Sequence, residues 1–462
     1  MVLVQSLPLL ALLALLGSGR AGPVPACLIA LLLALPAVAV SLPPAVGLPE
    51  FLPAETLRGV WLALQPMAIV AGGLLFHAAA APAAQADARE ATPARVFAAA
   101  VPLGCFLESV TGFAIGAVFA LGALRAMGIG GAVAVALSLQ ALILVPWGGL
   151  GPGTLLGATL LGLPPHEVAR MAGFPTVLWL PLLAPMIWAL QARAGLVVPP
   201  REKAMQALML AVLGGLVLGL HWVLPFEVIG VVASGIVLLW ALWRADPPRA
   251  AGPALRAAFP YLLLTTALLG ARLWPDPPAL RPFADLPGFA VTHVALVLWA
   301  VALGLLLARA DGGARLRGAM ARAGRPMLVM LLYVLLGRWL AGGGVAAALA
   351  AALADSAGGA ALPLMPPMGF LAGFVTGSNV GAQAALVAVQ AALGQAFALP
   401  PLLAPGMHNF MGAAGAGMSI AVTAMLCALA ADGTRPVQVW RLVWPSMALA
   451  SALGLGLLWW GA

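Results

Sequence analysis

Long apolar runs alternate with short polar breaks along the chain, and this pattern predicts membrane-spanning helices. A bilayer core is about 30 Å thick and takes about 20 residues of helix. We expect the first apolar run to be a membrane helix rather than a cleaved signal peptide, because no basic segment precedes it. The apolar windows lie near 2–17, 24–42, 57–80, 172–192, 204–224, 226–243, 257–274, 289–308, 326–341 and 440–460.

Two other regions, about 96–163 and about 344–430, stay apolar but are crowded with Gly, Pro, Ser, Thr and Asn. These residues interrupt helices. Irregular backbone at membrane depth is tolerated only where it is packed inside protein or lines a cavity. We therefore look for a functional site in these two regions.

The composition supports this interpretation, since 63% of the residues are hydrophobic and only 8% are charged. A typical soluble domain is roughly 25% charged, so a water-soluble protein is excluded. The net charge of +8 comes from basic residues that sit mainly in the breaks, as topology signals rather than a nucleic-acid surface. Arg193 to Lys203, Arg244 to Arg256 and Arg309 to Arg325 are each separated by two predicted spans. We expect all three on the cytoplasmic side.

Two sequence patterns occur twice and in the same order. The pattern V-T-G-x-x-x-G-A spans 110–117 and again 375–382. About 37 residues after each copy, G-x-x-G-x-G spans 148–153 and 412–417. This recurrence predicts an internal duplication, although close packing of small residues between helices is an alternative role for the glycines.

The predicted fold is therefore an all-α polytopic membrane protein with about 12 to 14 transmembrane segments in two inverted repeats with interrupted or re-entrant helices. We divide the chain into N-terminal helices (1–56), a first repeat half (57–243, motif region 96–163), connecting helices with a cytoplasmic linker (244–325) and a second repeat half (326–462, motif region 344–430).

The polar residues beside these glycines point to anion binding. A break in a membrane helix leaves backbone N–H groups without partners, and their partial positive charge can hold a small anion. Facing half-helices of inverted repeats are typical of secondary transporters. The predicted substrate-binding residues are Thr111, Gly112, Thr376, Gly377, Ser378 and Asn379, supported by the Gly-rich residues Gly151, Gly153, Gly415 and Gly417.

Two ionisable residues are candidates for proton coupling. Glu108 lies in an apolar segment, where an uncompensated carboxylate costs about 3 kcal/mol or more. It could carry a proton, bond the turn backbone or form an ion pair. His408 could titrate in the cycle or be a satisfied helix-end histidine. We expect Arg338 and Asp355 to form a structural ion pair. The alternative is that Arg338 is the counter-charge for a carboxylate substrate.

The segment 106–113 (Phe-Leu-Glu-Ser-Val-Thr-Gly-Phe), the segment 374–379 (Phe-Val-Thr-Gly-Ser-Asn) and the Gly-rich stretch after Asn409 resemble the bacterial L-lactate permease family. The resemblance covers about 57–460. It implies proton-coupled uptake of lactate, glycolate or a related short 2-hydroxy monocarboxylate across the bacterial inner membrane by alternating access. It also implies kinship with the ion-transporter superfamily, whose studied members are elevator-type dimers, and hence a homodimer.

Several alternatives stay open. A sodium-coupled or dicarboxylate carrier would use the same architecture, with carbonyls at Gly112 and Gly377 as cation ligands. A passive channel or an intramembrane enzyme would belong to another class. The chain has no HExxH, Asp-rich metal or GxSxG motif and no Cys or His cluster with ligand spacing. We therefore expect no enzyme, no metal and no cofactor, and as partners a small carboxylate, protons and the bilayer but no nucleic acid.

Overall fold

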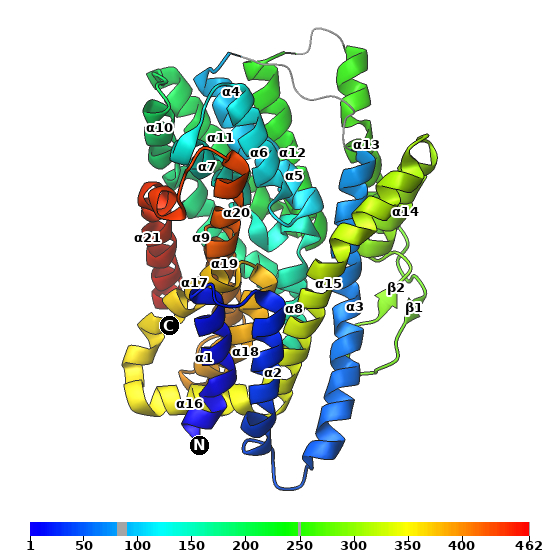
Figure 1. The fold of residues 1–462 in the computed structure, drawn as a ribbon, viewed down its shortest axis with the longest axis vertical. Helices are drawn as coiled ribbons and strands as arrows, with labels where there is room; N and C mark the ends of the chain where they lie inside the picture. The colour runs from blue at the N-terminus through cyan, green and yellow to red at the C-terminus, as the bar shows by residue number, and fades with distance from the viewer. Residues whose placement is uncertain (81–89, 248–250, 462) are drawn as a thin grey trace.

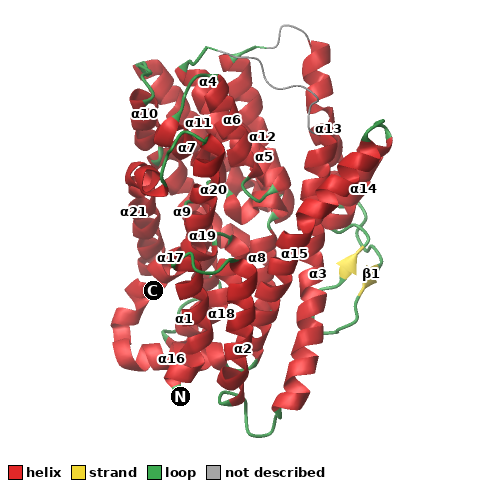
Figure 2. Ribbon diagram, viewed as in Figure 1, coloured by secondary structure: helices red, strands yellow, loops and turns green. Residues whose placement is uncertain are grey.

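A computed structural model describes residues 1–80, 90–247 and 251–461, and these ranges are almost entirely helical (Figures 1 and 2). Their one sheet is a short antiparallel pair in which Ala279 faces Ala290 and Leu280 faces Phe289. The described residues include nine helical stretches that are long and apolar enough to cross a membrane, together with several shorter apolar helices. The prediction of an all-α polytopic membrane protein is confirmed, while the number of 12 to 14 segments stays a prediction.

The elements outside the two motif regions are α1 (Val2–Gly17), α2 (Pro23–Ala39), α3 (Leu48–Ala80), α9 (Pro165–Leu182), α10 (Ala184–Arg193), α11 (Pro200–Gly219), η4 (Leu220–Trp222), α12 (Phe226–Ala245), α13 (Ala251–Ala271), β1 (Ala279–Leu280), β2 (Phe289–Ala290), α14 (Val294–Leu307), α15 (Gly312–Gly342), α16 (Val345–Ala357), η5 (Gly358–Leu364) and α21 (Pro436–Gly461).

Both motif regions are broken into short helices. The first contains α4 (Pro93–Ala98), the π-helical turn η1 (Ala99–Leu103), α5 (Gly104–Thr111), α6 (Ile115–Ala126), α7 (Gly131–Ser138), η2 (Leu139–Leu142), η3 (Val145–Leu150) and α8 (Pro152–Leu160). The second contains α17 (Met365–Thr376), α18 (Asn379–Ala396), α19 (Leu403–Gly417) and α20 (Ile420–Ala430).

The basic segment Arg309 to Arg325, at the end of the predicted cytoplasmic linker, is not a loop, because α15 begins at Gly312 and runs to Gly342. Arginine and alanine favour helix, and Asp311 pairs with Arg315 at 2.6 Å across the first turn. The guanidinium of Arg315 also donates to Ala78 O at 2.9 Å. Arginines that looked like linker charges thus satisfy carbonyls at the end of α3.

The three basic segments lie toward the same end of the long axis. The end of α10, the end of α12 and the start of α15 are all in the upper half of Figure 1. This arrangement agrees with the expectation that they share one side of the membrane. That this side is cytoplasmic stays a prediction.

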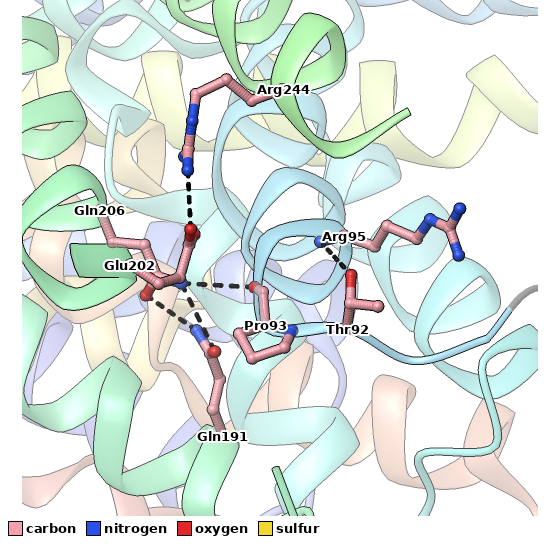
Figure 3. A network of polar contacts seen from close by, with 7 residues as sticks. All are labelled: Thr92, Pro93, Arg95, Gln191, Glu202, Gln206 and Arg244. Carbon is pink, nitrogen blue, oxygen red and sulfur yellow. Dashed lines mark hydrogen bonds and ion pairs between the residues drawn. The ribbon is translucent and has the colours of Figure 1, made fainter. Parts of the chain in front are cut away.

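A polar network fixes the start of the first motif region (Figure 3). Gln206 on α11 donates to Pro93 O at 3.3 Å and accepts from Gln191 Nε2 on α10 at 3.0 Å. Glu202 on α11 pairs with Arg244 on α12 at 2.9 Å. The helices around α4 therefore hold it in place, and α5 follows from this fixed start.

Candidate functional site

The first V-T-G motif forms the tip of a helical hairpin. Helix α5 ends at Thr111, and Gly112 has a φ of 71°, which favours glycine. The chain then turns so that α6 packs back against α5. A Cβ added at Gly116 would lie only 2.8 Å from Glu108 Cβ. The second glycine of the motif is therefore required for the close approach of the two arms.

Glu108 binds the turn of this hairpin through both carboxylate oxygens. Ala114 N–H donates to Oε1 at 3.0 Å and Gly116 N–H donates to Oε2 at 3.0 Å. The residue is 5% exposed, and no ion pair of the described residues includes it. Three roles were expected for Glu108, and its hydrogen bonds match the role in which it bonds the backbone of the turn. These bonds cap the N-terminus of α6.

The second V-T-G motif forms a hairpin of the same kind. Helix α17 ends at Thr376, Gly377 has a φ of 72° and α18 begins at Asn379. A Cβ at Gly381 would lie 2.7 Å from Thr376 Cβ. Figure 1 shows α5 and α6 in the upper half of the molecule and α17 and α18 in the lower half.

The two motif threonines use their hydroxyl groups locally. Thr111 Oγ1 lies 2.6 Å from Leu107 O, and Thr376 Oγ1 lies 2.7 Å from Ala372 O. Ser378 is the N-cap residue of α18, and its carbonyl lies 3.0 Å from Thr376 Oγ1. No hydrogen bond among the described residues joins Thr111 to Thr376. Each threonine hydroxyl therefore bonds backbone carbonyl groups at the end of its own helix.

The two Gly-rich elements differ in conformation. In the first, Gly149 and Gly151 have φ of 51° and 72°, and the backbone breaks between η3 and α8. In the second, Gly415 and Gly417 lie within α19, and the break follows at Ser419. The alanines between these glycines favour helix. Gly415 instead allows close contact, since a Cβ there would lie 2.0 Å from Phe370 O on α17.

The first Gly-rich element is where the two hairpins converge. A Cβ at Gly149 would lie 2.8 Å from Gly112 Cα at the tip of the first hairpin. A Cβ at Gly153 would lie 2.7 Å from Asn379 Nδ2 at the start of α18. The segment from η3 to α8 is thus in contact with both motifs.

A buried polar cluster occupies this junction. Asn409 Oδ1 on α19 accepts from Asn379 Nδ2 at 2.9 Å and from Gln383 Nε2 at 3.1 Å. Asn409 Nδ2 donates to Thr154 Oγ1 on α8 at 3.0 Å. All four residues are at most 5% exposed. Gln383 Oε1 has no hydrogen-bond partner.

Only Asn379 of this cluster belongs to the predicted substrate-binding residues. Thr154 directly follows the first G-x-x-G-x-G element, and Gln383 lies one helical turn after Asn379. The spacing of four residues placed Gln383 on the same helix face as Asn379. The contact between α8 and α18 has no signal in a single sequence.

The helix N-termini at the four interruptions fall into two classes. Glu108 caps α6, and Ser419 Oγ accepts from Val422 N–H at the start of α20 at 3.3 Å. Helices α8 and α18 begin without a side-chain cap. These two uncapped ends meet where Gly153 faces Asn379, so the partial positive charges of two helix dipoles add at the polar cluster.

His408 lies beside the cluster, within α19 rather than at a helix end. It is fully buried, and its Nε2 lies 3.1 Å from Ala382 O on α18. Its Nδ1 has no partner. Tyr333 on α15, which the sequence analysis did not select, contacts α18 from another side, since a Cβ at Gly381 would lie 3.1 Å from its Cζ. Its hydroxyl is buried beside the thiol of Cys27.

The expected pair of Arg338 with Asp355 is wrong. Arg338 on α15 forms an ion pair with Glu55 on α3, while Asp355 is exposed near the end of α16. The helices α3 and α15 pack along much of their length, which brings the two charges together across a large separation in sequence. Within the described ranges, no group of three or more His, Cys, Asp and Glu side chains gathers as metal ligands would.

No protein family model matches the sequence, and no curated protein matches it. Among solved structures, the chain is similar to the YdaH transporter of Alcanivorax borkumensis, with 16% sequence identity and a TM-score of 0.40. The comparison covers 95% of this chain and 98% of that chain. This similarity is too low to assign a family or a function.

Proposed function

We propose that the protein is a secondary active transporter of a small anion that binds between the N-termini of α8 and α18. The observation that carries this proposal is the meeting of these two uncapped helix ends at the buried cluster of Thr154, Asn379, Gln383 and Asn409. Polar side chains buried among the helices of a membrane protein are costly to place there, and they commonly mark a substrate pathway. Backbone N–H groups at a helix N-terminus favour a negatively charged ligand.

A short 2-hydroxy monocarboxylate matches the chemistry of this cluster. Its carboxylate accepts hydrogen bonds from amide donors, and the cluster offers the side-chain amides of Asn379 and Gln383 beside the backbone donors. Its hydroxyl can donate to Gln383 Oε1, which has no other partner. The resemblance of the motifs to those of L-lactate permeases points to the same class, with lactate or glycolate as the substrate.

The site is closed in this conformation, because its side chains bond one another directly. Access therefore needs movement of at least one hairpin. Gly112 and Gly377, both with positive φ, supply a hinge at each tip. In the proposed cycle the hairpins open in turn toward opposite sides, as in inverted-repeat transporters.

Glu108 is the proposed proton carrier. An ionised carboxylate accepts the two amide bonds that cap α6. Protonation converts one carboxylate oxygen into an O–H donor and leaves the carboxyl a weaker acceptor for the two N–H groups. Proton binding would weaken the cap and loosen the first hairpin, which lies against the same Gly-rich segment as the anion site. We also propose that the protein is located in the bacterial inner membrane.

Uptake by reconstituted protein tests this function. Liposomes that contain the purified chain should accumulate labelled L-lactate above the external concentration when the outside is acidic, with or without sodium. Accumulation that requires sodium would show that transport is coupled to sodium rather than to protons. Flux that never exceeds equilibrium would indicate a channel, and absence of flux for all short carboxylates would reject the proposal.

A further inference from the structure

A cavity of about 340 Å³ lies between the helices α9 and α10 on one side and α21 on the other. It shares no lining residue with the polar cluster. The lining residues include Leu182, Ala189, Arg193, Arg441, Trp444 and Leu449. Figure 1 shows α10 and α21 along the same edge of the molecule.

Two arginines line this cavity, and the other lining residues are apolar except for Ser446. Arg193 is the last residue of α10, and Arg441 lies in the second turn of α21. No ion pair or hydrogen bond of the described residues uses either guanidinium, and no acidic side chain lines the cavity. Both residues are exposed. The cavity thus has a net charge of two that the chain itself does not balance.

The rest of the lining suits hydrocarbon. Leu182 is 53% exposed and Trp444 is 61% exposed, on a face that lies against lipid in a membrane protein. An exposed tryptophan near a span end is typical of the interface between headgroups and acyl chains. Arg193 also belongs to the basic end of the molecule, where anionic headgroups of the cytoplasmic leaflet would lie.

We propose that this cavity binds one anionic phospholipid. The phosphate lies between Arg193 and Arg441, since guanidinium groups bind phosphate oxygens through two parallel N–H donors. An acyl chain follows the apolar groove past Leu182 and Leu449. A free phosphate ion would leave this apolar groove uncovered, which is why the occupant is a lipid. The inference is independent of the transported substrate.

The proposed lipid site lies between helices that belong to the two predicted repeat halves. Helices α9 and α10 follow the first motif region, and α21 follows the second. A lipid between them joins the outer helices of the two halves. Its binding should therefore stabilise the folded protein by mass action.

The test compares lipids and soluble headgroups on the purified protein in detergent. Phosphatidylglycerol should raise the melting temperature and remain bound in native mass spectrometry, while phosphatidylcholine should do neither. The double variant Arg193→Gln, Arg441→Gln should lose about 25-fold in lipid affinity, at about fivefold for each arginine. Arg201→Gln, which removes an exposed charge at the start of α11, is the matched control and should bind as the native protein does.

A second variant separates lipid loss from misfolding. Ala189→Trp adds a ring in the cavity at an exposed position, keeps both arginines and should displace the lipid without disturbing the interior. Equal lipid retention by the double arginine variant would overturn the proposal. Equal stabilisation by glycerol 3-phosphate would assign the site to a soluble phosphate, and a disulfide between two copies of Leu449→Cys in native membranes would assign the face to a subunit interface.

Discussion

Asn379 is the residue on which the proposed anion site depends most, because it joins α18 to α19 and faces the start of α8. Asn379→Ala should lower the affinity for L-lactate about tenfold or more, because the variant loses a buried amide donor that would bind the carboxylate. Calorimetry on the purified protein measures this. Gln395→Ala, at the exposed end of the same helix, should bind normally. Equal affinities for the native protein and Asn379→Ala would remove the site from this position.

The variant Glu108→Gln distinguishes the capping of α6 by Glu108 from its proposed role as proton carrier. Glutamine places an NH2 donor where one of the two carboxylate oxygens stood, so one backbone N–H loses its acceptor and the variant should unfold at lower temperature, with a loss of about 1.5–3 kcal/mol. Lactate should still bind, because Asn379 and the α8 N-terminus are unchanged. Uptake should no longer respond to a pH gradient. Native-like, gradient-driven uptake by this variant would show that Glu108 only caps the hairpin.

Close backbone contact at the hairpin tip gives a sharper steric prediction. Gly149→Ala adds a Cβ that would lie 2.8 Å from Gly112 Cα at a φ of 51°, so transport should fall strongly and stability by about 1–2 kcal/mol or more. Gly122→Ala on α6 meets nothing within 4 Å and should be tolerated or slightly stabilising. Thermal unfolding and uptake measured together check the pair. If both variants behave alike, the tip contact has no role.

At the scale of elements, the sequence predicted the regions in which the helices are interrupted, but not the backbone conformation at every interruption. Thr111-Gly112 and Thr376-Gly377 could be identified because a glycine with positive φ ends each helix. The second Gly-rich element could not, since Gly415 and Gly417 serve close packing inside α19. A glycine that breaks a helix and one that lets helices approach look alike in a single sequence.

The turns after α6 and α20 form a contact that links the two motif regions. Asp432 accepts from Gly131 N–H at 2.8 Å at the start of α7, and Arg125 donates to Leu429 O at 3.1 Å. The hydrogen bond from the Thr434 hydroxyl, followed by that from Gly131 N–H, lowers the pKa of Asp432. Since these bonds favour the ionised form, they stabilise the folded state above about pH 4, the unfolded pKa.

That stabilisation should be lost as the pH falls through the lowered pKa of Asp432. The difference in melting temperature between the native protein and Asp432→Asn should therefore be positive at pH 7 and shrink toward zero as the pH falls below the unfolded pKa of about 4. Thermal unfolding across this range measures it. A difference that stays constant with pH would show that the charge of Asp432 does not contribute.

At the scale of the whole molecule, the long apolar runs and the charge bias were enough to predict an all-α membrane protein with its basic segments at one end. They did not reveal that residues 312–325 continue a helix, because arginines occur both in loops and at helix ends that extend beyond the bilayer. They also could not reveal the contact of Arg338 with Glu55 or of Thr154 with Asn409, since both depend on how distant helices pack.

The most direct test of the central proposal is to locate a bound anion. Crystals grown with 3-bromopropionate, a short carboxylate that carries an anomalous scatterer, would show where it binds. The account predicts a bromine peak beside Asn379 and the N-terminus of α8 that excess L-lactate removes. A peak elsewhere that lactate displaces, with none at this junction, would contradict it.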